Sequence, residues 1–229
     1  MYKTIFFDLD DTLCDTVSNS RECLYDIYNE YEISKFYPTF TDFLTIYTPN
    51  TERLWAMYSR GEISKDYLLK ERFLVPFRPF KEVTEDMAMQ MNKDFLGRVK
   101  FKKKTIEGTK EILEYLKPRY TMHIISNGFS EIQYTKMESA GITSYFDKVI
   151  LSDAIGVNKP HPDIFDYALK ETGTDKKDAI MIGDNLFSDI NGAKNSGIDQ
   201  IWFNPNEDHD EGLQPTYTIK SLFELKDIL

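Results

Sequence analysis

Cysteine is scarce in this sequence, and long hydrophobic runs are missing from it. Of the 229 residues only 2 are cysteines, Cys14 and Cys23, which favours two reduced, partly buried thiols over a disulfide or a metal-binding pair. A membrane-spanning helix needs about 20 consecutive apolar residues, and no stretch approaches that length. Residues 1–4 lead directly into the first predicted strand and leave no room for a signal peptide. We therefore expect a soluble, cytoplasmic protein with no membrane partner.

An excess of positive charge is also missing. Lys and Arg together number 28 against 38 Asp and Glu, which gives a formal net charge of −10. Because an acidic chain repels the phosphate backbone, we expect no nucleic-acid polymer as a partner. A well-placed lysine can still bind one small phosphorylated metabolite. The length suits one α/β domain with an insertion or two small domains, and it is compatible with a monomer or a homodimer.

The most informative stretch is an apolar run followed by acids. Residues 5–7 have the composition of a buried strand, and Asp8, Asp10 and Asp11 come directly after it. Successive side chains of a strand point to opposite faces, so we expect Asp8 and Asp10 to share a face. Carboxylates at the end of a buried strand need compensation, and a divalent cation is the obvious candidate. A strand followed by an acidic turn is the alternative interpretation of this stretch alone.

Residues 16–99 contain no convincing strand pattern. Apolar residues recur there at helical spacing, and prolines and glycines separate the segments. Helices are predicted over residues 17–31, 41–46, 51–59, 64–73 and 84–99. A helical block therefore interrupts an α/β chain directly after its first strand.

From residue 105 onward, strands and helices alternate. Strands are predicted over residues 120–126, 148–152, 179–182, 200–203 and 217–219, and helices over residues 108–117, 130–140, 162–172, 186–196 and 221–229. Such alternation predicts an α/β fold with a doubly wound, Rossmann-like parallel sheet and helices on both faces. The carboxyl ends of parallel strands share one edge of the sheet, which is where ligands bind in such folds.

Polar residues follow three further strands at this edge. Ser126 and Asn127 end the second strand, Lys159 lies in a proline-stiffened loop beyond the third, and Asp184 and Asp189 follow the fourth. Each has an ordinary structural interpretation, as a turn, a solvated lysine or acids that cap a helix. Coincidence is a poor explanation for four successive strand ends that carry an acid pair, a hydroxyl, a lysine and a second acid pair. We therefore predict one site at this edge.

These residues resemble the motifs of the haloacid dehalogenase superfamily of phosphohydrolases. Residues 8–12 fit its first motif, Asp-x-Asp-x-Thr, and Ser126 fits the second. Lys159 fits the third motif, and Asp184 with Asp189 fits the fourth. The motifs occur in the right order, and the resemblance spans nearly the whole chain.

The same resemblance implies two domains. Residues 1–14 and 100–229 would form the α/β core domain, and residues 15–99 would form an all-helical cap domain of the C1 type. Such a cap is expected to close over the site, exclude water and select the substrate. Candidate residues for stacking on a nucleobase are Tyr47, Trp55, Phe77 and Phe80.

The resemblance also implies a role for each motif residue. Asp8 would be the nucleophile that forms an aspartyl-phosphate, and Asp10 would act first as acid and then as base. The cofactor would be Mg²⁺, held by Asp8, the Asp10 backbone carbonyl and Asp184. Asp189 would anchor a metal-bound water or the lysine. The phosphate-binding residues would be Ser126, Asn127 and Lys159.

Within the superfamily, residues 7–13 and 156–165 are most similar to bacterial house-cleaning pyrimidine 5′-nucleotidases, which implies nucleoside 5′-monophosphates as substrates. Phosphoglycolate and sugar-phosphate phosphatases share much of this pattern, so another small phosphorylated metabolite is the alternative substrate. Asp10 favours phosphoryl transfer over dehalogenation, because halide leaves without a proton. A non-catalytic scaffold that binds a ligand or partner is the alternative from another class. The intact set of motif residues argues against such a scaffold.

Overall fold

The computed structural model describes residues 2–229, which divide into two compact units. The first unit comprises the residues up to Thr16 together with Lys103–Leu229, and the second comprises Val17–Lys102. Separate clusters of buried apolar side chains lie in each unit. Each unit therefore has a core of its own, as independent domains do.

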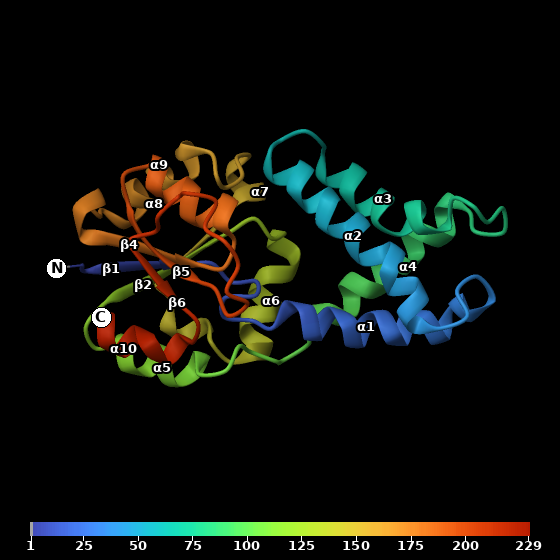
Figure 1. Ribbon diagram of the computed structural model, residues 1–229, viewed down its shortest axis with the longest axis horizontal. Helices are drawn as coiled ribbons and strands as arrows, with labels where there is room; N and C mark the ends of the chain where they lie inside the picture. The colour runs from blue at the N-terminus through green and yellow to red at the C-terminus, as the bar shows by residue number, and fades with distance from the viewer. Residues whose placement is uncertain (1) are drawn as a thin grey trace. The chain divides into compact units, whose positions relative to one another are not determined.

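Six parallel strands form the sheet of the first unit (Figure 1). They are β1 (Thr4–Phe7), β2 (Thr121–Ser126), β3 (Lys148–Leu151), β4 (Ala179–Gly183), β5 (Asp199–Phe203) and β6 (Tyr217–Ile219). Their order in the sheet is β3-β2-β1-β4-β5-β6, so β1 lies between β2 and β4. The doubly wound parallel sheet predicted from the alternation of strands and helices is confirmed.

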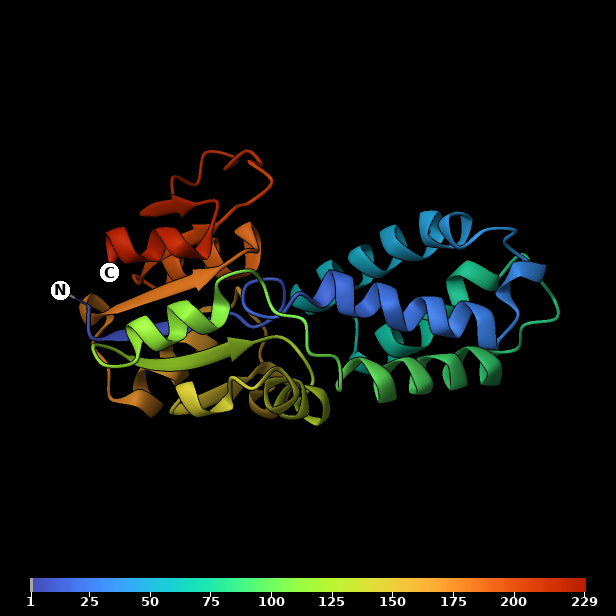
Figure 2. The same ribbon diagram turned by 90° about the horizontal axis from the view of Figure 1, so that it is seen from below.

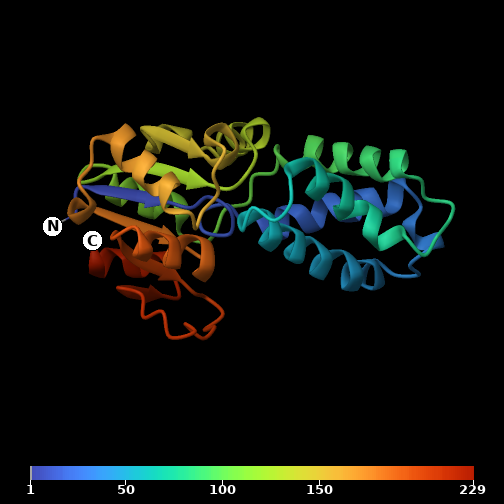
Figure 3. The ribbon, with the colours of Figure 1, turned by 90° about the horizontal axis from the view of Figure 1, so that it is seen from above.

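Helices cover both faces of this sheet. Against Ile5 and Phe7 on one face pack α5 (Thr109–Leu116), α6 (Ser130–Ala140), η5 (Leu222–Glu224) and α10 (Leu225–Ile228) (Figure 2). Against Phe6 on the other face pack α8 (Pro162–Thr172) and α9 (Gly192–Asn195) (Figure 3). Burial on both faces explains why β1 is an uninterrupted apolar run rather than an alternating one.

The carboxyl ends of the central strands meet at one edge of the sheet. Asp8 follows β1, Ser126 ends β2, and Asp184 follows β4. The predicted gathering of polar residues at this edge therefore has its structural basis in the strand order. The remaining short elements of this unit are η2 (Thr143–Tyr145), α7 (Ser152–Ile155), η3 (Lys176–Asp178) and η4 (Leu186–Asn191).

The second unit is helical. Its elements are α1 (Thr16–Glu30), η1 (Ile33–Lys35), α2 (Phe40–Ser59), α3 (Lys65–Phe77) and α4 (Glu85–Val99). The hydroxyl groups of Thr39, Ser64 and Thr84 cap the last three helices, and each accepts a hydrogen bond from a backbone N–H three residues later. These caps and an aromatic-rich core hold the bundle together.

Several stretches differ from the predicted pattern, two of them in an instructive way. Helix α2 continues through Pro49, where the sequence predicts a break. Buried side chains on both sides of the proline, including Phe43 and Leu54, stabilise the helix by packing, and this outweighs the missing hydrogen bond. The helix predicted over residues 186–196 begins as the π-helical segment η4, in which the Ile190 N–H bonds to the Asn185 carbonyl.

Two of the aromatic residues proposed as nucleobase contacts are core residues of the helical unit. Tyr47 and Phe77 are only 3% and 1% exposed, and the ring of Phe43 contacts both. We infer that these two side chains stabilise the bundle. Trp55 and Phe80 are partly exposed and stay candidates for contacts with a substrate.

Both cysteines are free and buried, Cys14 in the first unit and Cys23 in the second, as their small number predicts. None of the helices formed by residues 2–229 is both long enough and apolar enough to cross a bilayer.

Candidate active site

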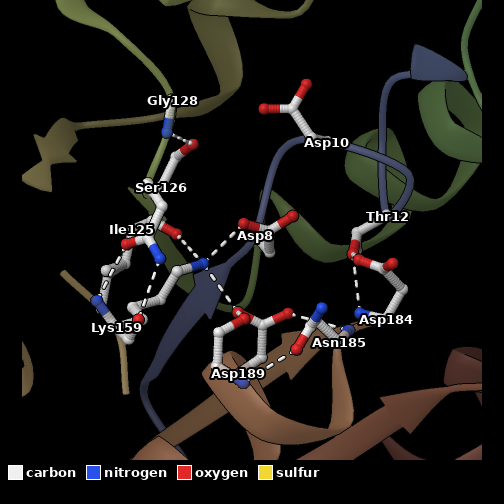
Figure 4. A network of polar contacts seen from close by, with 12 residues as sticks. Asp8, Asp10, Thr12, Ile125, Ser126, Gly128, Lys159, Asp184, Asn185 and Asp189 are labelled. Carbon is white, nitrogen blue, oxygen red and sulfur yellow. Dashed lines mark hydrogen bonds and ion pairs between the residues drawn. The ribbon is translucent and has the colours of Figure 1, made fainter. Parts of the chain in front are cut away.

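A buried lysine connects the predicted site residues (Figure 4). Lys159 is 1% exposed, and its Nζ lies 2.5 Å from Asp8 Oδ1 and 2.7 Å from Asp189 Oδ1. The same nitrogen donates to the Ile125 carbonyl at 2.7 Å. An ammonium group has three hydrogens, so these three acceptors satisfy it completely. Lys159 is therefore a fixed charge at the centre of the site rather than a solvated loop residue.

Asn127 fixes the backbone of the loop that carries this lysine. Its Nδ2 donates to the Lys159 carbonyl at 2.9 Å, and its Oδ1 accepts from the Lys159 N–H at 2.8 Å. The phosphate-binding role that the resemblance implies for Asn127 falls to its backbone N–H and stays a prediction, while its side chain bonds the lysine backbone. A carboxamide matches the donor and acceptor of a peptide group, which explains this preference.

Three carboxylates converge beside Lys159. Oxygen atoms of Asp8, Asp184 and Asp189 all lie within 4.8 Å of one another, and one ammonium group cannot neutralise three acids. Burial, opposed by Lys159 and reinforced by Asp189 and Asp10, raises the pKa of Asp8 to about 7. Burial and the neighbouring carboxylates also raise the pKa of Asp184 well above its usual range. Without a further cation, the folded protein therefore favours protonated carboxyl groups at this point.

This cluster has the chemistry of a divalent-cation site. Hard cations such as Mg²⁺ and Ca²⁺ bind carboxylate oxygens, and their charge offsets the repulsion between neighbouring acids. Asp8 Oδ1 is bonded to Lys159, whereas Asp8 Oδ2 has no hydrogen-bond donor among residues 2–229. The carboxylate oxygens at this edge of the sheet therefore fit a bound cation, and one Asp8 oxygen is free to react.

Thr12 and Trp202 fix the position of Asp184. Thr12 Oγ1 accepts from the Asp184 N–H and donates to Asp184 Oδ1, both at 2.9 Å. The indole N–H of Trp202 donates to the Asp184 carbonyl at 2.8 Å. No sequence pattern points to Trp202, because its role depends on the pairing of β5 beside β4.

The π-helical segment η4 directs Asp189 back toward Lys159. Asp189 is 1% exposed, and its Oδ2 accepts from the Asn185 N–H at 3.0 Å. A methyl group built on Gly183 would overlap the Asp189 carboxylate. Glycine at the end of β4 is therefore what allows this close approach.

Asp10 does not lie side by side with Asp8, although strand alternation predicts that it should. Strand β1 ends at Phe7, and the chain then turns through Asp11, whose φ is 58°. The alternation of a strand therefore stops before Asp10. In Figure 4 the Asp10 carboxylate points away from Asp8.

Three donors hold the Asp10 carboxylate in this orientation. Gln133 Nε2 donates to Oδ2 at 2.6 Å, Thr16 Oγ1 donates to Oδ1 at 2.6 Å, and the Lys136 ammonium group bonds Oδ1. Burial alone would raise the pKa of Asp10, but the Lys136 charge and these hydrogen bonds outweigh burial and lower it. Asp10 is therefore a fixed, ionised group in the absence of substrate.

Gln133 and Lys136 are not among the site residues predicted above, although the sequence carries a signal for them. Residues 133, 136, 137 and 140 are buried and follow the i, i+3, i+4, i+7 spacing of the core-facing side of a helix. Glutamine and lysine are rarely buried without a specific partner. Polar residues at core positions of α6 therefore indicate a site that the residues directly after β2 do not reveal.

Comparisons with known proteins identify the family of the chain. Residues 5–203 match the family described as haloacid dehalogenase-like hydrolase. The chain is 32% identical to pyrimidine 5′-nucleotidase YjjG of Escherichia coli, with 98% of this chain and 96% of that protein covered. It is 37% identical to glyceraldehyde 3-phosphate phosphatase of Pyrococcus abyssi, with coverage of 89% and 82%. The HAD-hydrolase YfnB of Bacillus subtilis, in a structure described as bound to magnesium, matches with a TM-score of 0.91 and 25% identity over 100% of this chain and 98% of that one. The chain belongs to the haloacid dehalogenase-like hydrolase family.

Proposed function

We propose that this hydrolase is a Mg²⁺-dependent phosphatase that cleaves a phosphomonoester by transferring the phosphoryl group to Asp8. The observation that carries the proposal is the free Oδ2 of Asp8, whose other oxygen is bonded to Lys159 within an acidic cluster. A carboxylate can attack a phosphate dianion only where the negative charges are offset. When bound by Asp8, Asp184 and the Asp10 carbonyl, Mg²⁺ would supply that charge together with the lysine.

Ser126 is suited to hold the transferring phosphoryl group. Its Oγ accepts from Gly128 N–H at 3.0 Å and from Gln133 Nε2 at 2.8 Å. Because a hydroxyl oxygen has two lone pairs, both are then in use and the hydroxyl hydrogen is left to donate to a phosphoryl oxygen. Lys159 contributes its charge to the same group through Asp8.

Asp10 is ionised without substrate, so it would take up the proton of the phosphate monoanion when the substrate binds, pass it to the leaving alkoxide and then activate the water that hydrolyses the aspartyl-phosphate. In an in-line displacement the leaving oxygen lies on the opposite side of phosphorus from the attacking one. An acid that serves this oxygen should therefore lie apart from the Asp8 carboxylate, as the Asp10 carboxylate does (Figure 4). Attack of that water would release phosphate, return Asp8 to its free state and leave the proton of the water on Asp10.

Nucleoside 5′-monophosphates are the leading substrate class, with pyrimidines preferred. The full-length similarity to a pyrimidine 5′-nucleotidase supports this choice. A triose or other sugar phosphate is the second candidate, supported by the 37% identity to a glyceraldehyde 3-phosphate phosphatase. Residues of the helical unit, with Trp55 and Phe80 as candidates, would then distinguish these substrates.

The proposal is tested by phosphate release from a panel of monoesters with Mg²⁺ or with EDTA. The panel contains pyrimidine and purine nucleoside monophosphates, glyceraldehyde 3-phosphate, phosphoglycolate and 4-nitrophenyl phosphate, with Asp8→Asn as the blank. We expect release that requires Mg²⁺ and is most efficient with pyrimidine monophosphates. More efficient release from a sugar phosphate than from nucleotides would change the proposed substrate class and leave the proposed mechanism unchanged. No release above the blank from any ester would contradict the proposal and favour a binding scaffold.

A further inference from the structure

We propose that Gln133 is a positioning residue that holds the Asp10 carboxylate and the Ser126 hydroxyl in a fixed relation. This inference rests on the acid–base role proposed for Asp10. The Gln133 amide group donates to Asp10 Oδ2 at 2.6 Å and to Ser126 Oγ at 2.8 Å. An amide NH₂ group has two hydrogens, so one serves Asp10 in the turn beyond β1 and the other serves Ser126 at the end of β2.

The backbone beside Gln133 leaves room for this amide. Gln133 is 1% exposed, and a methyl group built on Gly128 would overlap its Nε2 and Cδ and would lie 2.9 Å from its Cγ. Gly128 is not among the glycines with a positive φ, so its backbone conformation does not require glycine. The close approach of Gln133 therefore explains the residue at this position.

Lys136 and Thr16 hold the remaining oxygen of the same carboxylate. The Lys136 ammonium group, in a side chain that is 6% exposed, bonds Asp10 Oδ1, and Thr16 Oγ1 donates to the same oxygen at 2.6 Å. Lys136 follows Gln133 by one helical turn, so both side chains lie on one face of α6. With both oxygens bonded, the carboxylate cannot rotate without breaking a hydrogen bond.

The consequence concerns the leaving group. An alkoxide leaves only when an acid protonates it, whereas 4-nitrophenolate leaves without a proton. If Gln133 sets the position of Asp10 relative to the phosphoryl group that Ser126 holds, the loss of Gln133 should slow the hydrolysis of alkyl esters more than that of the nitrophenyl ester. If the role of Gln133 were merely structural, its loss would slow the hydrolysis of both esters equally.

The test measures kcat/KM with Mg²⁺ for the best alkyl monoester of the panel and for 4-nitrophenyl phosphate. Gln133→Met removes the amide, and Gly128→Ala displaces it without removing it. We expect the alkyl-to-aryl ratio to fall about tenfold or more in both variants, a part of the 10²–10⁴-fold that an acid–base group typically contributes. Gln200→Met is the matched control, because Gln200 is also buried, at 4% exposure, and lies in β5. Its ratio should equal that of the wild type.

Asp10→Asn distinguishes a failure of the role proposed for Gln133 from a failure of the acid role proposed for Asp10. If Asp10→Asn lowers the ratio but Gln133→Met and Gly128→Ala do not, the role of Gln133 is wrong and the proposed function stands. If Asp10→Asn leaves the ratio unchanged, the acid role of Asp10 is wrong and the inference falls with it. Should Gln133→Met fail to fold, Gly128→Ala alone decides, since the three atoms nearest to its added methyl group all belong to the Gln133 side chain.

Discussion

The ammonium group of Lys159 is shared between carboxylates that reach it from two different strand ends. It bonds Asp8 after β1 and Asp189 beyond β4. Lys159 stays protonated. Burial alone would lower its pKa, but the attraction of Asp189 and Asp8 outweighs burial and raises the pKa of Lys159. Its removal would leave a buried acidic cluster without its bonded cation, which is far less favourable than the loss of an exposed ion pair.

We expect Lys159→Met to lower the free energy of unfolding by about 3–5 kcal/mol at pH 8 in EDTA, the usual result of breaking a buried pair. The loss should be smaller at pH 5.5. Folding raises the pKa of such a carboxyl group. As the pH rises from the pKa of the unfolded state to that of the folded state, this group therefore destabilises the folded protein increasingly. For Asp8 this pH range ends at a pKa of about 7 in the wild type and extends to higher pH in Lys159→Met. Urea unfolding at the two pH values measures the difference.

Lys3→Met is the matched control for this variant. It removes an ion pair between Lys3 and Asp178 in which the lysine side chain is 75% exposed. We expect little change in stability at either pH, because water screens exposed pairs. Equal losses at pH 5.5 and pH 8 in Lys159→Met would contradict the electrostatic account of the site.

At the scale of elements, the junction between β4 and η4 decides where Asp189 lies. The π-helical turn brings the residue back over the strand end, and Gly183 leaves space for its carboxylate. π-Helical turns occur often at functional sites. The position of an acid that would support the proposed cation site therefore depends on a backbone irregularity and on one missing Cβ.

Gly183→Ala should shift the Asp189 carboxylate and weaken Mg²⁺ binding about tenfold, which is the lower end of the effect of losing a residue that supports metal ligands. The overpacked junction should also lower the free energy of unfolding by about 1–3 kcal/mol. Mg²⁺ titration followed by the rise in thermal stability measures the affinity.

Gly97→Ala serves as the comparison, since no atom within 4 Å would meet the added methyl group. Alanine is favoured over glycine inside a helix such as α4, so this variant should be as stable as the wild type or more so. Unchanged Mg²⁺ affinity in Gly183→Ala would show that the close approach of Asp189 has no influence on the cation site.

Most elements follow from local patterns, and the exceptions have physical causes. The apolar run of residues 5–7 predicts β1, and Gly141 and Gly173 mark the ends of α6 and α8 with positive φ values. Pro49 is misleading because packing along α2 overrides it. The orientation of Asp10 could not be predicted, since it depends on donors from α6 more than 100 residues away in the chain, 123 in the case of Gln133.

At the scale of the whole molecule, the order of motifs along the chain carries more information than any single motif. Asp8, Ser126, Lys159 and Asp184 are far apart in sequence, and each has an ordinary interpretation alone. Parallel strand ends bring them to one edge, so the topology predicted from alternation also predicts the site. The substrate could not be predicted in this way, because the helical unit that is expected to choose it carries no comparable pattern.

The most direct test of phosphoryl transfer to Asp8 is chemical trapping of the phosphoenzyme. The full-length protein is mixed with a ³²P-labelled substrate from the panel and Mg²⁺, quenched in acid during turnover and mapped by peptide. We predict a hydroxylamine-sensitive label on the peptide that contains Asp8, with no label in Asp8→Asn or in EDTA. A label on another residue, or phosphate release that continues in Asp8→Asn, would contradict the account.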